Sequence, residues 1–126
     1  MQKTIIYQIL PRLWGNGKAR PKKNGTLADN GTGKFSDIDH NTLKYLKWLG
    51  CSHVWYTGVI RHSTQASEEG CIPSHPQFVK GKAGSPYAIC DYYDVNAYLA
   101  DDPQQRMEEF ESLIARTHEA GLKVII

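Results

Sequence analysis

Apolar and β-branched residues gather in short runs along the chain, and the spacing within those runs changes from one to the next. Residues 4–10, 52–57 and 123–126 form compact runs of β-branched, aromatic and other apolar side chains, a pattern that predicts strands. Between these runs, large apolar residues recur at steps of three and four, as on one face of a helix. Each helical pattern ends at a glycine, Gly50 or Gly121, which supplies the left-handed conformation that ends helices.

The order strand, helix, strand, helix, strand predicts an α/β fold with a parallel sheet, because parallel neighbours need a crossover connection. The second helix has a clear start, since Asp102 is a capping residue and Pro103 suits a first turn. The last strand, residues 123–126, is of the kind that is buried on both faces. We therefore expect residues 1–126 to be the leading part of a larger domain. Alone, such a chain would fold only with help and would self-associate through uncovered apolar faces and edges.

Two long segments lie outside the periodic pattern: a loop at residues 13–34 and an expected loop insert at residues 58–100. The first is rich in glycine and lysine, and long loops in compact domains are usually functional or mobile. Its charged cluster at residues 18–23 is interpreted as a solvated face, with an anion site as the alternative. Residues 31–34 superficially resemble a phosphate loop. Nucleotide binding is not expected, because Phe35 stands where Ser or Thr is required.

Composition and charge change this picture little. The chain has 126 residues, 40% of them hydrophobic, which suits one globular domain with a real core. A net charge of +2 does not indicate a nucleic-acid partner, and no apolar run approaches the ~18 residues of a membrane span. Cys51, Cys71 and Cys90 are odd in number and widely spaced, which predicts no disulfide framework and no metal site. Reduced thiols favour a cytoplasmic setting.

Several segments resemble, in the same order, motifs of the α-amylase family of glycoside hydrolases. The first strand carries Tyr-Gln-Ile-Leu-Pro-Arg, similar to the family's opening Tyr-Gln-Ile-Phe-Pro-Arg, and residues 84–92 are similar to its Gly-Tyr-x-x-x-Asp-Tyr segment. The last helix and strand resemble those that precede the family's Asp-x-x-x-Asn-His motif. The further segments that carry the resemblance are the first helix and the second strand, residues 43–50 and 53–60.

This resemblance implies the N-terminal portion of a (β/α)8 barrel, with its first three strands in residues 1–126. It also implies an enzyme that cleaves α-1,4-linked glucans with retention, using two carboxylates about 5–5.5 Å apart. In the family these carboxylates follow the fourth, fifth and seventh strands, so no catalytic residue is carried over. The chain alone is expected to be inactive. The alternative is a non-catalytic carbohydrate-binding module.

The resemblance also assigns candidate binding residues for an α-glucan or maltooligosaccharide. Tyr87 matches the family tyrosine that stacks on the sugar at the cleavage subsite, and the binding-module alternative would use the same residue. Asp91 matches the aspartate of the same motif and is expected to position the loop by a hydrogen bond. His62 follows the second strand at the edge where barrel enzymes build their sites, and it is a weaker candidate for substrate contact.

Two positions depart from patterns within the family. Some members bind calcium in the loop after the first strand, but here Lys34 puts an ammonium where a carboxylate ligand would stand. No calcium is therefore expected in this segment, although a full-length enzyme could bind it elsewhere. Exo-acting glucosidases often carry an acidic residue three positions before the stacking tyrosine. Gly84 stands there in this chain, which slightly favours an open, amylase-like cleft.

Overall fold

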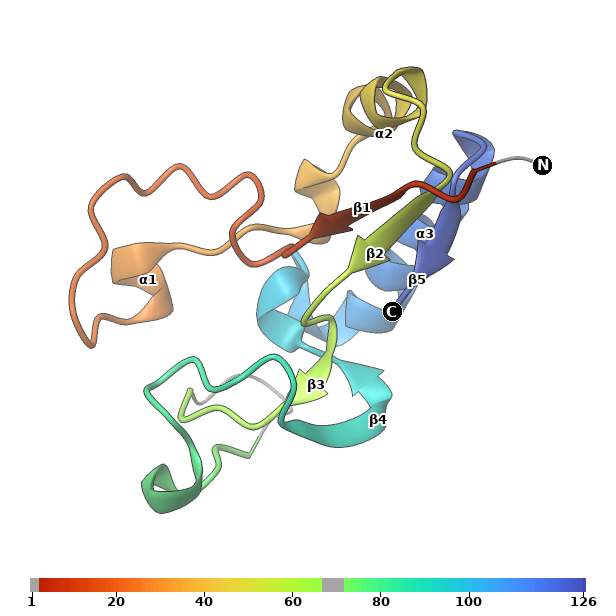
Figure 1. Cartoon of the computed structure of the whole chain (residues 1–126). Coiled ribbons are helices and arrows are strands. Elements are labelled where there is room, and N and C mark those ends of the chain that lie inside the picture. Colours follow the sequence, from red (N-terminus) through yellow and green to blue (C-terminus); the bar gives the residue numbers. More distant parts are fainter. Residues whose placement is uncertain (1–2, 67–71) are drawn as a thin grey trace.

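A computed structural model describes residues 3–66 and 72–126 of the chain. In this part of the molecule, β1 (Ile6–Ile9), β2 (His53–Tyr56) and β5 (Lys123–Ile125) form a three-stranded parallel sheet in the order β1-β2-β5 (Figure 1). In register, Gln8 lies opposite Trp55 and Trp55 lies opposite Ile125. The predicted α/β fold and its parallel sheet are therefore confirmed. Each strand is shorter than the apolar run that predicted it.

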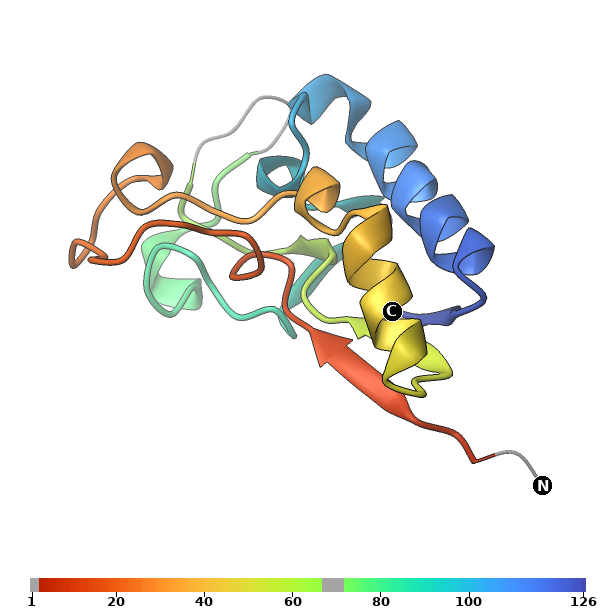
Figure 2. The same cartoon turned by 90° about the horizontal axis from the view of Figure 1, so that it is seen from above.

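Helices α2 (His40–Trp48) and α3 (Arg106–Glu119) are the crossover connections, and they pack side by side against one face of the sheet (Figure 2). The Asp39 side chain caps the start of α2 by accepting from the amide of Thr42 at 2.8 Å. Both helices end close to the predicted glycines, whose φ angles of 89° and 77° lie in the left-handed region. The helix predictions are thus confirmed.

The strands turn alternate side chains to the two faces of the sheet, and these faces differ sharply in burial. On the helix side, Val54 and Tyr56 of β2 are buried, and the Tyr56 hydroxyl lies 2.7 Å from that of Thr117 in α3. On the opposite face, Ile6 and Gln8 of β1 are exposed. The core therefore lies between the sheet and its two helices, and it continues into the buried residues 95–100.

The expectation of a structureless loop insert at residues 58–100 is wrong for its two ends. β3 (Ile60–His62) and β4 (Ile89–Val95) form an antiparallel pair just beyond the carboxyl end of β2. Their pairing shifts register on both sides of Arg61, which breaks the regular alternation. Two 3₁₀ helices, Pro76–Phe78 and Ala97–Leu99, lie in the same stretch.

The glycine-rich segment, residues 13–34, is mostly loop as predicted, but it also holds the short helix α1 (Leu27–Asn30). Thr26 caps this helix in a reciprocal box with Asp29, whose carboxylate accepts from the Thr26 amide at 2.9 Å. The hydrogen bonds from the Thr26 amide and hydroxyl lower the pKa of Asp29. A 3₁₀ helix, Phe35–Asp37, leads from this loop toward α2.

The start of α3 differs in detail from the prediction. Asp102 does act as a cap, accepting from the amide of Gln104 at 3.0 Å, but it caps a 3₁₀ helix, Pro103–Gln105, that precedes α3. The reciprocal contact comes from Glu109 in place of the neighbouring glutamine. Its two carboxylate oxygens each accept, at 2.8 Å, from the backbone amides of Asp101 and Asp102. A side chain one turn inside the helix therefore fixes the entry of the chain.

A partly buried ion-pair cluster fastens the β3–β4 pair to α3. The Asp94 carboxylate accepts from Arg106 at 2.7 Å and 3.1 Å, and Arg61 of β3 lies 3.4 Å from it. Sequence reasoning interpreted Asp94 as a turn residue, and the structure corrects this, because Asp94 lies inside β4 with an 11% exposed side chain. Burial alone would raise the pKa of Asp94, but the hydrogen bonds and charge of Arg106 outweigh it and lower the pKa.

Removing this carboxylate should loosen the junction. We expect Asp94→Ala to lower the free energy of unfolding by about 2 kcal/mol, because two half-buried guanidinium groups lose their anion. Urea denaturation followed by circular dichroism measures the change. The matched control is Asp101→Ala, which removes an exposed carboxylate of a neighbouring turn. Equal losses in the two variants would show that the ion-pair cluster has no special role.

The exposed face of the edge strand β1 should drive self-association. Ile6 is 50% exposed on an edge strand, next to the free hydrogen-bonding groups of that edge. We expect the chain to sediment as concentration-dependent oligomers and Ile6→Lys to shift it toward monomer. Trp48→Lys, which changes an exposed residue on the outer side of α2, should leave the oligomers intact. A compact monomer at all concentrations would contradict this expectation.

Candidate functional site

The candidate residue Tyr87 lies beyond the carboxyl ends of the parallel strands. Leu10 follows β1 and Gly58 follows β2, and a Cβ built on Gly58 would meet both Leu10 and Pro86. Pro86 thus holds the start of the Tyr87 segment against this edge of the sheet. The Tyr87 side chain is 70% exposed, so its aromatic face is free to contact a ligand. The carboxyl edge of parallel strands is where α/β folds generally place their sites.

The glycine three positions before Tyr87 is required by the backbone. Gly84 has a φ of 66°, and a Cβ at this position would collide with the carbonyl oxygen of Ser63. An acidic side chain therefore cannot stand here without moving the segment that follows β3. The position beside Tyr87 is left open by necessity.

Asp91 lies in β4, opposite Arg61 in the register of the antiparallel pair. Its carboxylate accepts from the amide of Tyr93 at 2.9 Å, so it shapes the backbone of its own strand. Tyr92 and Tyr93, which follow it, are both strongly exposed. The hydrogen bond agrees with the expected positioning role, while contact of Asp91 with a sugar stays a prediction.

His62 is buried, with 3% of its surface exposed, and it belongs to a hydrogen-bond network centred on Asn96. The Asn96 side-chain oxygen accepts from the His62 amide at 3.1 Å, and its NH₂ group donates to the carbonyls of Gly58 and Ile60. The same NH₂ lies 3.0 Å from His62 Nδ1, and His62 Nε2 lies 3.0 Å from the carbonyl of Ala83. Both ring nitrogens therefore face protein groups. A role of His62 at the substrate stays a prediction that this geometry does not favour.

The network also fixes the protonation of the ring. Because the amide NH₂ of Asn96 can only donate, Nδ1 of His62 is the acceptor, and Nε2 carries the proton toward Ala83. A second proton on Nδ1 would face those donors. Burial lowers the pKa of His62, and the nearby charge of Arg12 lowers it further. The neutral ring thus ties β3 to the turn that precedes Tyr87.

Sequence reasoning missed Asn96, the residue that organises this edge. It is buried, with 3% of its surface exposed, and it bonds both the chain after β2 and strand β3. The available signal was an amide side chain between apolar residues, Val95 and Ala97, since buried polar groups are nearly always hydrogen-bonded. Its partners lie 34 to 38 positions away along the chain, and nothing in the sequence identifies them.

Lys34 is a further organising residue at this edge. Its ammonium donates to the backbone carbonyls of Tyr98 and Ala100 at 2.9 Å and 2.7 Å. It thereby links the end of the glycine-rich loop to the 3₁₀ helix after β4, as a bound cation would. Among the described residues, no group of three His, Cys, Asp or Glu side chains is arranged to hold a metal ion.

The cysteines take no part in this edge as a group. Cys51 is a buried free thiol and Cys90 an exposed one, whose Sγ lies 3.6 Å from the carbonyl of Arg61. Cys71 lies outside the described residues. Within the described part of the chain, no helix is both long and apolar enough to cross a membrane.

The buried neutral His62 should make folding stability depend on pH. The unfolded chain takes up a proton at this residue as the pH falls through about 6.5, whereas the folded chain resists protonation, so stability is lost on acidification. We expect a loss of up to about 1.4 kcal/mol per pH unit below that point, measured by urea denaturation. His62→Gln should lose part of this dependence, and the exposed His118→Gln should keep it. An NMR titration in which both rings take up a proton at the same pH would refute the expectation.

No protein-family model matches the sequence, and neither does any curated protein. Solved structures do match. An α-amylase from Lactobacillus plantarum superposes with a TM-score of 0.61 at 25% identity, covering 96% of this chain and 21% of that one. A maltogenic α-amylase from Thermotoga neapolitana gives 0.60 at 25% identity, covering 96% and 22%. An acarbose-bound α-amylase from Geobacillus thermoleovorans gives 0.61 at 19% identity, covering 98% and 22%, and it shows the fold alone.

The chain spans about a fifth of the length of these α-amylases. Within that share, its strands, helices and connecting segments follow theirs almost from end to end. The order of the sequence motifs and the superposition agree, and together they show that the chain is related to the α-amylases.

Proposed function

We propose that this chain forms the first three strands of an α-amylase-type (β/α)8 barrel whose enzyme cleaves α-1,4-linked glucans with retention. The observation that carries the proposal is the superposition of 96% of the chain on two α-amylases at 25% identity. The parallel order β1-β2-β5, with a helix after β1 and another before β5, is the arrangement such a barrel requires. Because the chain covers about a fifth of those enzymes, the activity is assigned to a protein that contains it.

In this proposal Tyr87 is the sugar platform. A pyranose ring presents an apolar face of C–H groups, and an exposed phenol ring at the carboxyl edge of the sheet is suited to stack on it. Pro86 packs near Gly58, and the Asn96–His62 network holds the turn at Ala83, so the segment that carries Tyr87 is fixed at both ends. The ring is exposed while its backbone is anchored, as a binding platform needs.

The remaining polar groups at this edge support binding, and they do not amount to bond-breaking machinery. Retaining hydrolysis needs a nucleophile and an acid/base about 5–5.5 Å apart. Among the described carboxylates near Tyr87, Asp91 bonds a backbone amide and Asp94 pairs with two arginines. We therefore expect the 126-residue chain to release no reducing sugar from amylose. The reading frame that contains it should encode an Asp-x-x-x-Asn-His motif after β5.

Substitution of the platform tests the proposal. In the full-length protein, Tyr87→Ala should lower kcat/KM on amylose by about tenfold, because the stacked ring contributes on the order of 1 kcal/mol. Reducing-sugar release measures the rate. Tyr45→Ala is the matched control, since it removes an exposed tyrosine from α2, far from the carboxyl edge. Equal effects of the two substitutions would contradict the assignment of Tyr87.

Calorimetry separates this proposal from the binding-module alternative, which the 70% exposure of Tyr87 also suits. If the platform works only together with opposing loops, the 126-residue chain should show no heat of binding with maltoheptaose. Binding that Tyr87→Ala abolishes, combined with a full-length protein that leaves amylose intact, would favour the module and overturn the enzyme.

A further inference from the structure

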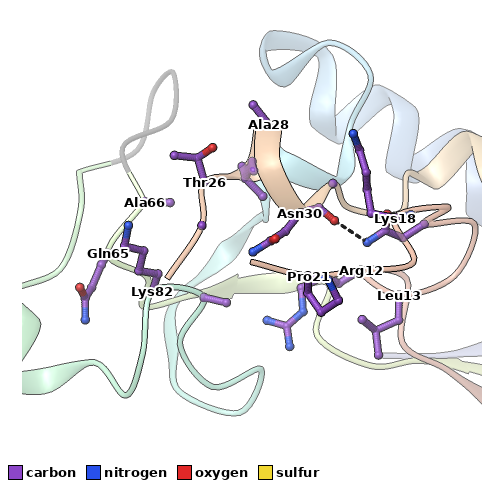
Figure 3. A pocket seen from close by; sticks show the side chains of 15 residues that line it. Arg12, Leu13, Lys18, Pro21, Thr26, Ala28, Asn30, Gln65, Ala66 and Lys82 are labelled. Carbon is purple, nitrogen blue, oxygen red and sulfur yellow. Dashed lines mark hydrogen bonds between the residues drawn. The ribbon is translucent and has the colours of Figure 1, made fainter. Parts of the chain in front are cut away.

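A cavity of about 680 Å³ lies between the glycine-rich loop and the segment that follows β3 (Figure 3). Arg12, Lys18 and α1 border it on one side, and Gln65, Lys82 and Ala83 border it on the other. Its volume falls within the range of sites for small molecules, roughly 300–1,000 Å³. The proposed glucan function does not use this cavity.

The charge of the cavity wall has one sign. Arg12, Lys18 and Lys82 come from separate segments of the chain, and none of the described residues that line the cavity is Asp or Glu. The nearest described carboxylate, Asp29, is already bonded to Thr26 and lies 3.6 Å from Lys22. Like charges that converge without an anion repel one another, so the arrangement favours a negatively charged ligand.

Arg12 carries the second, independent observation. Its Nη1 is fully buried and has no hydrogen-bond partner among the described residues. A buried donor without an acceptor costs on the order of 1–3 kcal/mol, and more when it is charged, so such groups are rare without a ligand. Guanidinium groups match the geometry of phosphate and carboxylate oxygens, and they stay charged at any physiological pH.

Hydrogen bonds to backbone groups hold both walls in place. On one side, the Asn16 side chain donates to the carbonyl of Asn30, and Asn30 in turn bonds both the amide and the carbonyl of Lys22. On the other side, the Gln65 side chain donates to the carbonyls of Val79 and Gly81. The cavity is therefore bordered by fixed segments.

The backbone at Arg12 is also fixed. The amide of Gly33 donates to the Arg12 carbonyl at 2.7 Å, and a Cβ on Gly33 would collide with the carbonyls of Pro11 and Trp14. The loop can approach this closely because the residue is glycine. The close approach places the base of the Arg12 side chain at the floor of the cavity.

We propose that this cavity binds the phosphate group of a small phosphorylated molecule, with the phosphate between Arg12 and Lys82. A phosphate monoester carries close to two negative charges at pH 7, which suits three converging cations better than a single carboxylate does. The remaining wall, from Leu13, Pro21 and Leu27, is apolar and can contact the carbon skeleton of the ligand. This assigns Lys18 to the anion-site alternative for the charged cluster at residues 18–23.

Calorimetry with the full chain tests the proposal, using glucose 6-phosphate, inorganic phosphate and glucose as probes at low salt. We expect saturable binding of glucose 6-phosphate and none of glucose. Binding of inorganic phosphate with equal affinity would identify free phosphate as a sufficient ligand, and weaker binding would identify the ester. Heat from neither anion at millimolar concentration, or equal heat from glucose, would overturn the proposal.

Substitutions locate the site. Arg12→Gln and Lys82→Gln should each weaken binding by about tenfold or more, whereas Lys44→Gln removes an equivalent charge from the exposed face of α2 and should have no effect. Circular dichroism checks the fold of each variant. If Arg12→Gln does not fold, the exposed Lys82→Gln carries the test. Equal weakening by Lys44→Gln and Lys82→Gln would show diffuse attraction to a basic surface and would overturn the site.

Discussion

The pairing of β2 with a parallel neighbour on each side is the constraint on which the rest of the structure depends. β1, β2 and β5 come from segments about 50 and 70 residues apart, and parallel pairing requires each connection to return across the sheet. α2 and α3 make these returns, and both then cover the same face. All carboxyl ends consequently point one way, and the loops that hold Tyr87, Asn96 and Lys34 gather at that edge.

Local pattern predicts the parts of this fold that depend on local physics. The helical spacing of Leu43, Leu46, Phe110 and Leu113 predicts their burial, because one face of each helix must meet the sheet. The β3–β4 pair escaped prediction for the same reason. β3 has three residues and an irregular register, and Tyr92 and Tyr93 are both exposed, so strict alternation is lost. Without that alternation, the segment cannot be distinguished from a loop.

The candidate site divides along a similar line. Tyr87 and Asp91 were found because a family motif surrounds them, and the structure places Tyr87 at the carboxyl edge with an exposed ring. Asn96 and Asp94 were not found, because their roles depend on partners in other elements. A polar residue in an apolar segment signals a buried partner, but the sequence does not say where the partner lies.

The lysine at the end of the glycine-rich loop has a consequence for how this edge responds to its surroundings. An ion held by carbonyl and carboxylate oxygens can be removed by a chelator, and its occupancy follows the supply of that ion in solution. Lys34 supplies its positive charge through a covalent tether to the same chain, and it bonds the carbonyls of Tyr98 and Ala100 directly. This junction therefore forms together with the polypeptide and holds equally well in calcium-poor and calcium-rich media.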